Sequence, residues 1–242
     1  MTTITVTSKN FKKMAKKLRT LKPETIVLGL SLTNKQTRWF IKQIAESDEH
    51  YEEIRNEYEC SEMAKNLTPM KPEIFAKAIS KTKSWNFLYN YTLTGVQIEC
   101  MLQAIQHENS VVEDLDLVDV CLYGVPPALL SHALLNVKKV HLHNMDPDQL
   151  LALFDLIVSR DSDSHPLQEI TFLYLWNIPN NMDKIVLKSA AERVSIKVHS
   201  LPSMIADLGL ILRISNEEQA WSLTKLYDYH VFKTIKEFHR LP

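Results

Sequence analysis

The stretch VEDLDLVDVCLYGVPPALLSHAL, from Val112 to Leu134, contains two different hydrophobic periods. Leu115 and Leu117 are two residues apart, as in a strand that buries one face. After a turn that contains Gly and Pro, Leu130 and Leu134 are four residues apart, which is about one helical turn. The stretch therefore predicts a strand followed by a short amphipathic helix.

The same arrangement recurs along the chain. Eight segments align on an apolar anchor residue, at intervals between 23 and 35 residues. The anchors are Val6, Leu32, Leu67, Leu93, Leu122, Met145, Ile178 and Leu201. Eight residues after the anchors stand Met14, Phe40, Phe75, Met101, Leu130, Leu153, Val186 and Gly209. Twelve residues after them stand Leu18, Ile44, Ile79, Ile105, Leu134, Ile157, Ala190 and Arg213.

Both positions are apolar in the first seven segments, so each of these predicts a helix that faces a core. Thr, Asp or Pro follows most anchors and indicates where the helix begins. Strand-like pairs precede the later helices at Leu115/Leu117, Val140/Leu142, Ile170/Phe172 and Ile196/Val198. Such a unit cannot bury its apolar face alone, so we expect neighbouring units to stack around one continuous core.

The spacing Val112-x-x-Leu115-x-Leu117-x-x-Val120-x-Leu122 resembles the strand template of leucine-rich-repeat proteins. The similar type is the longer, helix-bearing repeat of ribonuclease-inhibitor-like proteins and of nucleotide-binding leucine-rich-repeat receptors, which include innate immune receptors. Val120, Met145 and Leu175 stand where that family favours Asn or Cys. The resemblance implies an α/β solenoid of about seven to eight degenerate repeats over residues 1–213, with a curved parallel sheet on the concave side and helices on the convex side.

Both ends of the chain leave this pattern. The segment 214–242 is predicted to be a C-terminal helical cap, and a partner-binding amphipathic helix is the alternative. Its apolar positions are Trp221, Leu226, Tyr227, His230, Val231, Ile235 and Phe238. At the other end, strand-like Ile4-Thr5-Val6 follows almost directly on the first residue without a polar capping unit. We therefore expect the solenoid to be part of a larger multidomain chain.

Composition limits the partners and the compartment. The 242 residues carry a formal net charge of −1, which gives no general attraction for nucleic acid or an anionic membrane. No apolar run is long enough to span a bilayer, and no secretion signal is present. Cys60, Cys100 and Cys121 lack paired spacing, which favours reduced thiols and a cytoplasmic location.

Two blocks of charge interrupt this neutral balance. Between residues 9 and 22 lie seven basic residues and no acidic one: Lys9, Lys12, Lys13, Lys16, Lys17, Arg19 and Lys22. Between residues 46 and 62 lie eight acidic residues and only Arg55 as a basic one. A solvated convex face explains both blocks, and the steering of a charged partner or attraction between the two blocks are the alternatives.

No motif for chemistry is present. His141 and His143 have strand spacing that brings two rings to one side, but two ligands are too few for a metal site. The chain lacks a Gly-rich phosphate loop, a G-x-S-x-G elbow, an H-E-x-x-H helix and a paired C-x-x-C. We therefore expect neither an enzyme nor a bound cofactor or metal.

The residues expected to contact a partner are the strand residues between the core-facing ones, because alternation sends them to the concave surface. They are Asp114, Asp116, Lys139, His141, Glu169 and Thr171, together with Trp85, Phe87 and Tyr89 if Leu88 faces the core. A shift of that last strand by one residue would bury all three aromatic side chains instead. The sequence leaves both registers open.

These features favour a non-catalytic protein-interaction domain, a scaffold or ligand-sensing module that binds a protein partner on its concave face. The alternative is a regulatory subunit that acts on an enzyme, as a GTPase activator or as a substrate receptor of a ubiquitin ligase. The identity of the protein partner does not follow from the sequence.

Overall fold

The computed structural model describes residues 2–56, 65–85, 91–118, 120–142, 145–160, 166–174, 189–190, 193–200 and 221–222. In this part of the chain, an open sheet contains eight parallel strands whose spatial order is their order in the sequence. They are β1 (Thr3–Val6), β2 (Thr25–Leu28), β3 (Tyr51–Asn56), β5 (Thr82–Trp85), β7 (Asp114–Leu117), β8 (Lys139–Leu142), β9 (Glu169–Tyr174) and β10 (Ser195–Ser200).

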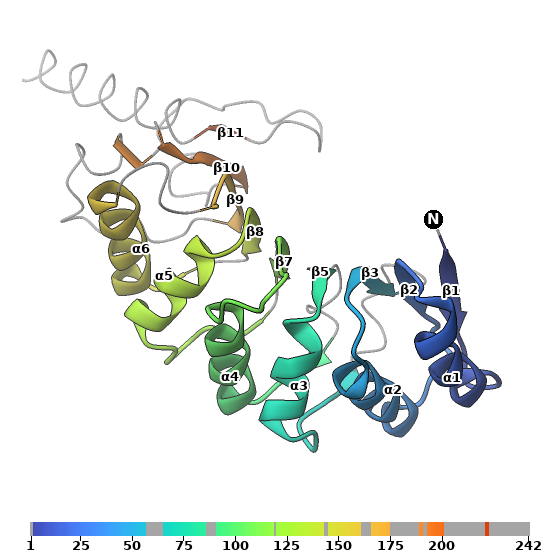
Figure 1. Cartoon of the computed structure of the whole chain (residues 1–242). Helices are drawn as coiled ribbons and strands as arrows, with labels where there is room; N and C mark the ends of the chain where they lie inside the picture. Colours follow the sequence, from blue (N-terminus) through green and yellow to red (C-terminus); the bar gives the residue numbers. More distant parts are fainter. Residues whose placement is uncertain are drawn as a thin grey trace, which may run out of the picture.

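Six described helices connect these strands. They are α1 (Phe11–Leu21), α2 (Asn34–Glu46), α3 (Pro72–Ile79), α4 (Gly95–Ile105), α5 (Pro127–Leu135) and α6 (Pro147–Ser159). The helices lie along the outer side of an arc and the strands along its inner side (Figure 1). A separate parallel pair, β4 (Lys65–Asn66) and β6 (Tyr91–Thr92), lies outside the main sheet. The predicted α/β architecture with an open parallel sheet is therefore confirmed.

One hydrophobic core lies between the sheet and the helices. The helix positions expected to face a core do so: Phe40, Phe75, Met101, Leu130 and Leu153 are fully buried, and Met14 is partly buried against the same core. The strand pairs Leu115/Leu117, Val140/Leu142 and Ile170/Phe172 are fully buried as well. The apolar residues with strand spacing and those with helix spacing therefore pack against each other in one core.

Amide side chains at the helix starts connect each unit to the one before it. In α4, the side-chain amide of Gln97 donates to the carbonyl oxygens of Leu67 and Met70, at 2.9 and 2.8 Å. In α6, Gln149 donates in the same way to Leu122 and Val125, both at 2.9 Å. Both carbonyl pairs belong to the turn that precedes the previous helix, so a buried glutamine fastens two neighbouring units together.

The same glutamines complete the N-terminal caps of their own helices. Thr94 Oγ1 accepts from the Gln97 backbone N–H, while Gln97 Oε1 accepts from the Thr94 backbone N–H. Thr33 and Gln36 form the same reciprocal pair at the start of α2. Each pair satisfies two backbone donors that a helix start otherwise leaves unpaired. The prediction that Thr marks the beginning of these helices is confirmed.

Only two residues of the predicted C-terminal cap are described, so the helical cap over 214–242 stays a prediction. Trp221 and Ser222 form β11 (Trp221–Ser222), which pairs antiparallel with β10 and is not helical. A strand at this point continues the sheet beyond β10, so the described part of 214–242 extends the sheet edge. The remaining residues of the predicted cap lie outside the described residues, as do Ile178, Val186, Leu201, Gly209 and Arg213.

Candidate functional site

The sheet presents two rows of side chains on the face opposite the helices, and we call this the concave surface. Row A runs from β1 to β10 through Thr3, Thr25, Glu53, Ser84, Asp114, Lys139, Glu169 and Ser195. Row B contains Thr5, Val27 and Arg55, and then Asp116, His141, Thr171 and Lys197. Between the rows lies a buried row from Ile4 to Ile196, which faces the core.

Most of the residues predicted to contact a partner lie together on this surface. Asp114, Lys139 and Glu169 are direct neighbours in row A, on three consecutive strands. Asp116 and His141 are neighbours in row B. All five are exposed or half-buried, so the alternation read from β7, β8 and β9 predicted their side of the sheet.

Trp85 is not part of this surface. Its side chain is fully buried, and its backbone pairs in register with Ile54 and Leu115, which are also fully buried. The indole N–H donates to the Ile79 carbonyl oxygen at 3.2 Å, at the end of α3. The register in which Trp85 lies exposed is therefore wrong, and the register that buries it holds. Phe87 and Tyr89 lie outside the described residues.

Thr171 needs a second correction. It takes its place in row B beside His141 and Lys197, as the alternation predicts, but only 4% of it is exposed. A side chain buried to this degree offers almost no area to a partner. Alternation thus predicted the side of the sheet correctly and the accessibility of Thr171 incorrectly.

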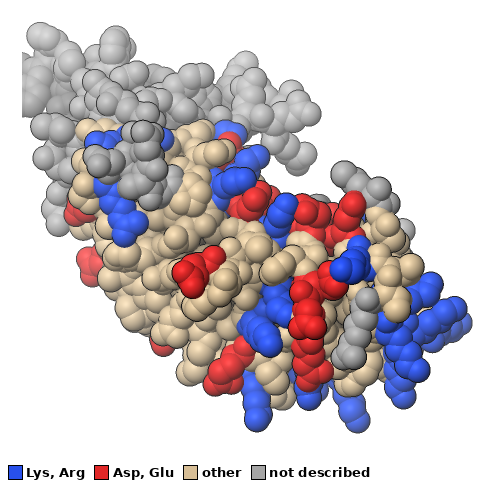
Figure 2. All heavy atoms as spheres, in the orientation of Figure 1, with Lys and Arg blue, Asp and Glu red and all other residues tan. Residues whose placement is uncertain are grey.

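Charged residues of both signs lie on the concave surface, and their sign alternates across Asp114, Lys139 and Glu169. Lys197 forms an ion pair with Glu169 at 2.5 Å, and Arg55 lies 3.7 Å from Glu53. Figure 2 shows acidic and basic side chains side by side along the inner side of the arc. Lys197, Arg55 and Glu53 were not among the predicted contacts. Lys197 lies between Ile196 and Val198, so the period-two signal would have identified it, whereas Ile54 has no apolar residue two positions away and gives no such signal for Glu53 and Arg55.

Asp114 is the least well satisfied group of this surface. Its Oδ1 atom is buried without a hydrogen-bond partner among the described residues, and His141 Nε2 lies 3.9 Å away from it. Burial raises the pKa of the Asp114 carboxyl, the neighbouring His141 and Lys139 lower it, and Glu169 and Glu53 raise it further. The net result is a raised pKa, so the ionised form of Asp114 is disfavoured in the folded chain.

The variant Asp114→Asn is therefore expected to be more stable than the wild type at pH 7. The folded chain holds the Asp114 proton more tightly than the unfolded chain, so this carboxyl favours folding at low pH and loses that contribution as the pH rises through its folded pKa. Thermal unfolding at several pH values should show a higher midpoint for the variant at neutral pH and a shrinking difference toward the ordinary pKa of 3.8.

Asp155→Asn, a change at an exposed carboxylate on α6, is the matched control and should shift the midpoint little at any pH. Equal midpoints for wild type and Asp114→Asn at pH 7 would show that burial of this carboxylate has no cost.

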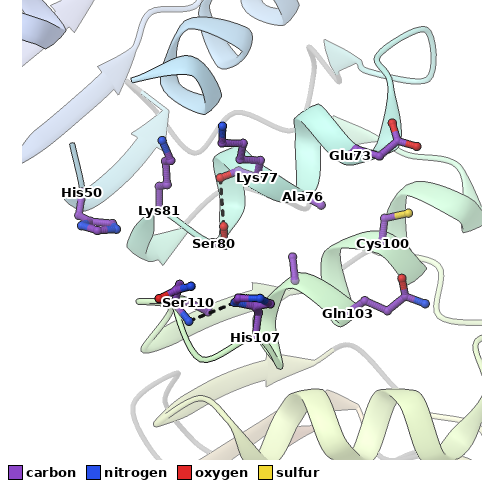
Figure 3. Close-up of a pocket in the computed structure, with 12 residues that line it drawn as sticks. His50, Glu73, Ala76, Lys77, Ser80, Lys81, Cys100, Gln103, His107 and Ser110 are labelled. Atoms are coloured by element: carbon purple, nitrogen blue, oxygen red, sulfur yellow. Dashed lines mark hydrogen bonds between the residues drawn. The ribbon is translucent and has the colours of Figure 1, made fainter. Parts of the chain in front are cut away.

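A pocket of about 570 Å³ lies on the helix side, between α3 and α4. Its lining includes Lys77, Lys81 and His107, near the C-terminal ends of these helices (Figure 3). Figure 3 shows the side chains of Lys77 and Lys81 directed away from His107, and the Lys81 ammonium donates to the Ser47 carbonyl oxygen. Cations at helix C-termini offset the carbonyl end of the helix dipole. These residues are thus explained by the fold, and the concave surface is the stronger candidate.

Among the described residues, no three His, Cys, Asp or Glu side chains are grouped so that they could hold a metal ion. In the same part of the chain, no helix combines the length and apolar character needed to cross a bilayer. Comparison with protein-family models, with curated proteins and with solved structures finds no match to this chain.

Proposed function

We propose that this chain is a leucine-rich-repeat domain that binds a protein partner along its concave surface without transforming it. The observation that carries the proposal is row A, which is polar on all eight hydrogen-bonded strands and alternates in charge at β7, β8 and β9, with the shorter row B beside it. The leucine-rich-repeat assignment is supported by the burial of the template positions Val112, Leu115, Leu117, Val120 and Leu122.

The size of the surface suits a protein. Neighbouring strands are about 4.8 Å apart, so the five steps from β3 to β10 span about 24 Å. This length is compatible with an interface that buries about 800 Å² on each partner. A sheet held by one continuous core is already ordered, so binding loses little conformational entropy.

The charge pattern indicates the chemistry of recognition. Interfaces use complementary charges to select a partner and fix its orientation. Asp114 brings a buried oxygen without a hydrogen bond, and Lys139 brings an exposed ammonium that forms no ion pair with the described residues. A partner that places a carboxylate opposite Lys139 would pair with this exposed ammonium. Asp114 Oδ1 is buried, so it would accept a hydrogen bond from a partner only after the Asp114 side chain moves.

Combined replacement of Asp116, Lys139 and His141 is expected to weaken partner binding at least about tenfold. Asp116 Oδ1 accepts from the Val118 backbone N–H at 3.0 Å, so Asp116→Asn is used to keep an acceptor, with Lys139→Ala and His141→Ala. The partner is isolated by affinity capture from a native extract and identified by mass spectrometry. Its affinity for each variant is then measured by calorimetry, and the thermal midpoint of each variant is recorded.

The matched control changes the same residue types on the helix side: Asp155→Asn, Lys77→Ala and His132→Ala. Both triple variants should retain the wild-type thermal midpoint within a few degrees, because their side chains are exposed or half-buried. A partner that is lost by the helix-side variant and kept by the sheet-side variant would place the binding surface on the helices. Unfolding of the sheet-side variant would place its residues in the core.

A further inference from the structure

The first helix carries a positively charged face that no described residue neutralises. Lys12, Lys13 and Lys16 of α1 have the i, i+1 and i+4 spacing that places Lys12 and Lys16 one turn apart with Lys13 beside them, Lys9 lies in the turn just before the helix, and all four are exposed. We call them the lysine face. The opposite side of α1 is apolar and packs into the core through Ala15 and Leu18. The lysine face therefore points away from the body of the molecule.

Local contacts leave this charge uncompensated. In the described part of the chain, Lys22, at the end of α1, pairs with Glu49 at 2.9 Å, whereas the four lysines of the face form no ion pair. The Lys12 ammonium lies 6.0 Å from the centre of the Phe11 ring, which is a weak cation–π contact. Like charges at these spacings repel one another and lower helix stability slightly.

The helix dipole adds to the positive field of the lysine face. The first turn of α1 contains no acidic residue, and the N-cap residue Asn10 makes no capping hydrogen bond to it. The Asn10 side chain instead accepts from Thr7 N–H and donates to the Thr5 carbonyl oxygen. Unpaired N–H groups at a helix start favour negative charge. Lysines and helix start together therefore favour an anionic ligand at the same place.

The surroundings favour one class of anion. α1 has 11 residues and is about 16 Å long. Beyond its C-terminal end, Lys22 pairs with Glu49, which follows Glu46 and Asp48 in the sequence, and Figure 2 shows basic side chains gathered at this end of the arc. A flat bilayer or a long nucleic-acid backbone on the lysine face would extend over these carboxylates. Ala15 and Leu18 are buried and only Leu21, at the C-terminal end of α1, is an exposed large apolar side chain of this helix, so α1 offers no continuous apolar face to insert into lipid.

We infer that the lysine face binds a short acidic segment of a polypeptide, rich in Asp and Glu. Carboxylates of such a segment would pair with Lys12, Lys13 and Lys16 and approach the N–H groups of the first turn. A short segment ends before the acidic residues beyond Lys22. It is therefore attracted by the lysines and is not repelled by those carboxylates, as a longer polyanion would be. This surface lies on the helix side of the arc and is separate from the concave surface.

The probe is a short fluorescein-labelled peptide in which Glu alternates with Ser, and its Gln-containing counterpart serves as the uncharged reference. Fluorescence anisotropy should detect binding of the acidic peptide at low salt, and binding should weaken steeply as salt is added. The variant Lys12→Gln/Lys13→Gln/Lys16→Gln should bind it at least about tenfold more weakly. Gln has nearly the same helix propensity as Lys, so circular dichroism should show an unchanged fold.

The matched control removes the same charge from later units of the array: Lys42→Gln, Lys71→Gln and Lys77→Gln. It should retain wild-type affinity within about twofold, because these exposed lysines belong to α2 and to the start and end of α3 and not to the lysine face. If both variants lost the same affinity for the acidic peptide, binding would depend only on the net charge of the protein, and the inference would be overturned. Tighter binding of single-stranded RNA or of phosphatidylserine vesicles, lost in the same lysine-face variant, would assign the surface to a different partner.

The concave triple variant, Asp116→Asn with Lys139→Ala and His141→Ala, should bind the acidic peptide as well as the wild type does. This result would show that the lysine face binds the peptide independently of the concave surface. The two proposals can therefore fail separately. Loss of peptide binding in the concave variant would place the acidic segment on the sheet and overturn the inference.

Discussion

Replacement of Trp85 by alanine is expected to lower the free energy of unfolding by about 3–5 kcal/mol. Trp85 is fully buried in β5 and lies in register between Ile54 of β3 and Leu115 of β7. Its truncation leaves a cavity between three strands and removes the indole N–H that satisfies the Ile79 carbonyl oxygen. Urea denaturation followed by circular dichroism measures the loss.

Trp39→Ala is the matched control, because Trp39 is 36% exposed and packs edge-to-face on Phe11 with ring centres 5.3 Å apart. Its truncation should cost about 1 kcal/mol, the typical value of such an exposed aromatic contact. The Trp85→Phe variant should fall between wild type and Trp85→Ala, since it keeps most of the ring area and loses the hydrogen bond. If the Trp85→Ala protein were as stable as the wild type but unable to bind its partner, Trp85 would be an exposed contact residue and not part of the core.

The strands β7 and β8 were predictable because each alternates strictly between apolar and polar residues, as the first four residues of β9 also do. In β7, Leu115 and Leu117 are buried, while Asp114 and Asp116 are half-buried on the other face. A strand with two apolar and two charged residues has only one register that avoids burying charge. The side of the sheet on which the candidate residues lie therefore follows from the sequence alone.

The strand β5 was not predictable in the same way. Its residues Thr82–Trp85 include a single apolar side chain, and Thr82 is as completely buried as Trp85. With one apolar residue, alternation fits either register equally well. The choice is made by the neighbours, since Ile54 and Leu115 place Trp85 in the buried row. This information comes from strand pairing, which the local sequence does not contain.

The glutamines that join neighbouring units were missed although a signal is present. Gln36, Gln97 and Gln149 each stand three residues after the Thr or Asp that precedes its helix. That spacing is the sequence pattern of a reciprocal helix cap. Asn10 stands at the same distance after Thr7 and likewise accepts from its backbone N–H. The pattern predicts the helix cap. The hydrogen bonds from the glutamine side chain to carbonyl oxygens of the preceding unit depend on how closely the units stack, which the pattern does not contain.

Replacement of Gln97 by leucine is expected to lower the free energy of unfolding by about 3–5 kcal/mol, because each buried polar group left without a partner costs about 1–3 kcal/mol. Leucine fills a similar volume and forms none of the three side-chain hydrogen bonds of Gln97. The carbonyl oxygen of Met70 and the N–H of Thr94 then lose the partner that Gln97 supplies, and the carbonyl oxygen of Leu67 keeps only the Met70 N–H. Since Leu67 and Met70 are buried, water cannot easily replace the amide.

Gln36→Leu is the graded control. Gln36 makes one bond to the preceding unit, to the Ser8 carbonyl oxygen at 3.2 Å, and it is half-buried. Water can reach that carbonyl in the variant, so the cost should be about 1 kcal/mol. Gln149→Leu, which also breaks two buried bonds, should match Gln97→Leu. If Gln36→Leu and Gln97→Leu lowered the free energy of unfolding equally, the hydrogen bonds to the buried carbonyl oxygens would add no stability beyond that of the helix cap.

The Gln97 variant also tests how the units depend on one another. In an array of stacked units, stability comes from the interfaces between neighbours as much as from each unit itself. Hydrogen exchange should therefore accelerate in α3 and β5, on the side of the broken contact, more than in α6. Acceleration spread evenly over all described helices would instead indicate that the chain unfolds as a single cooperative body in which the position of a contact does not matter.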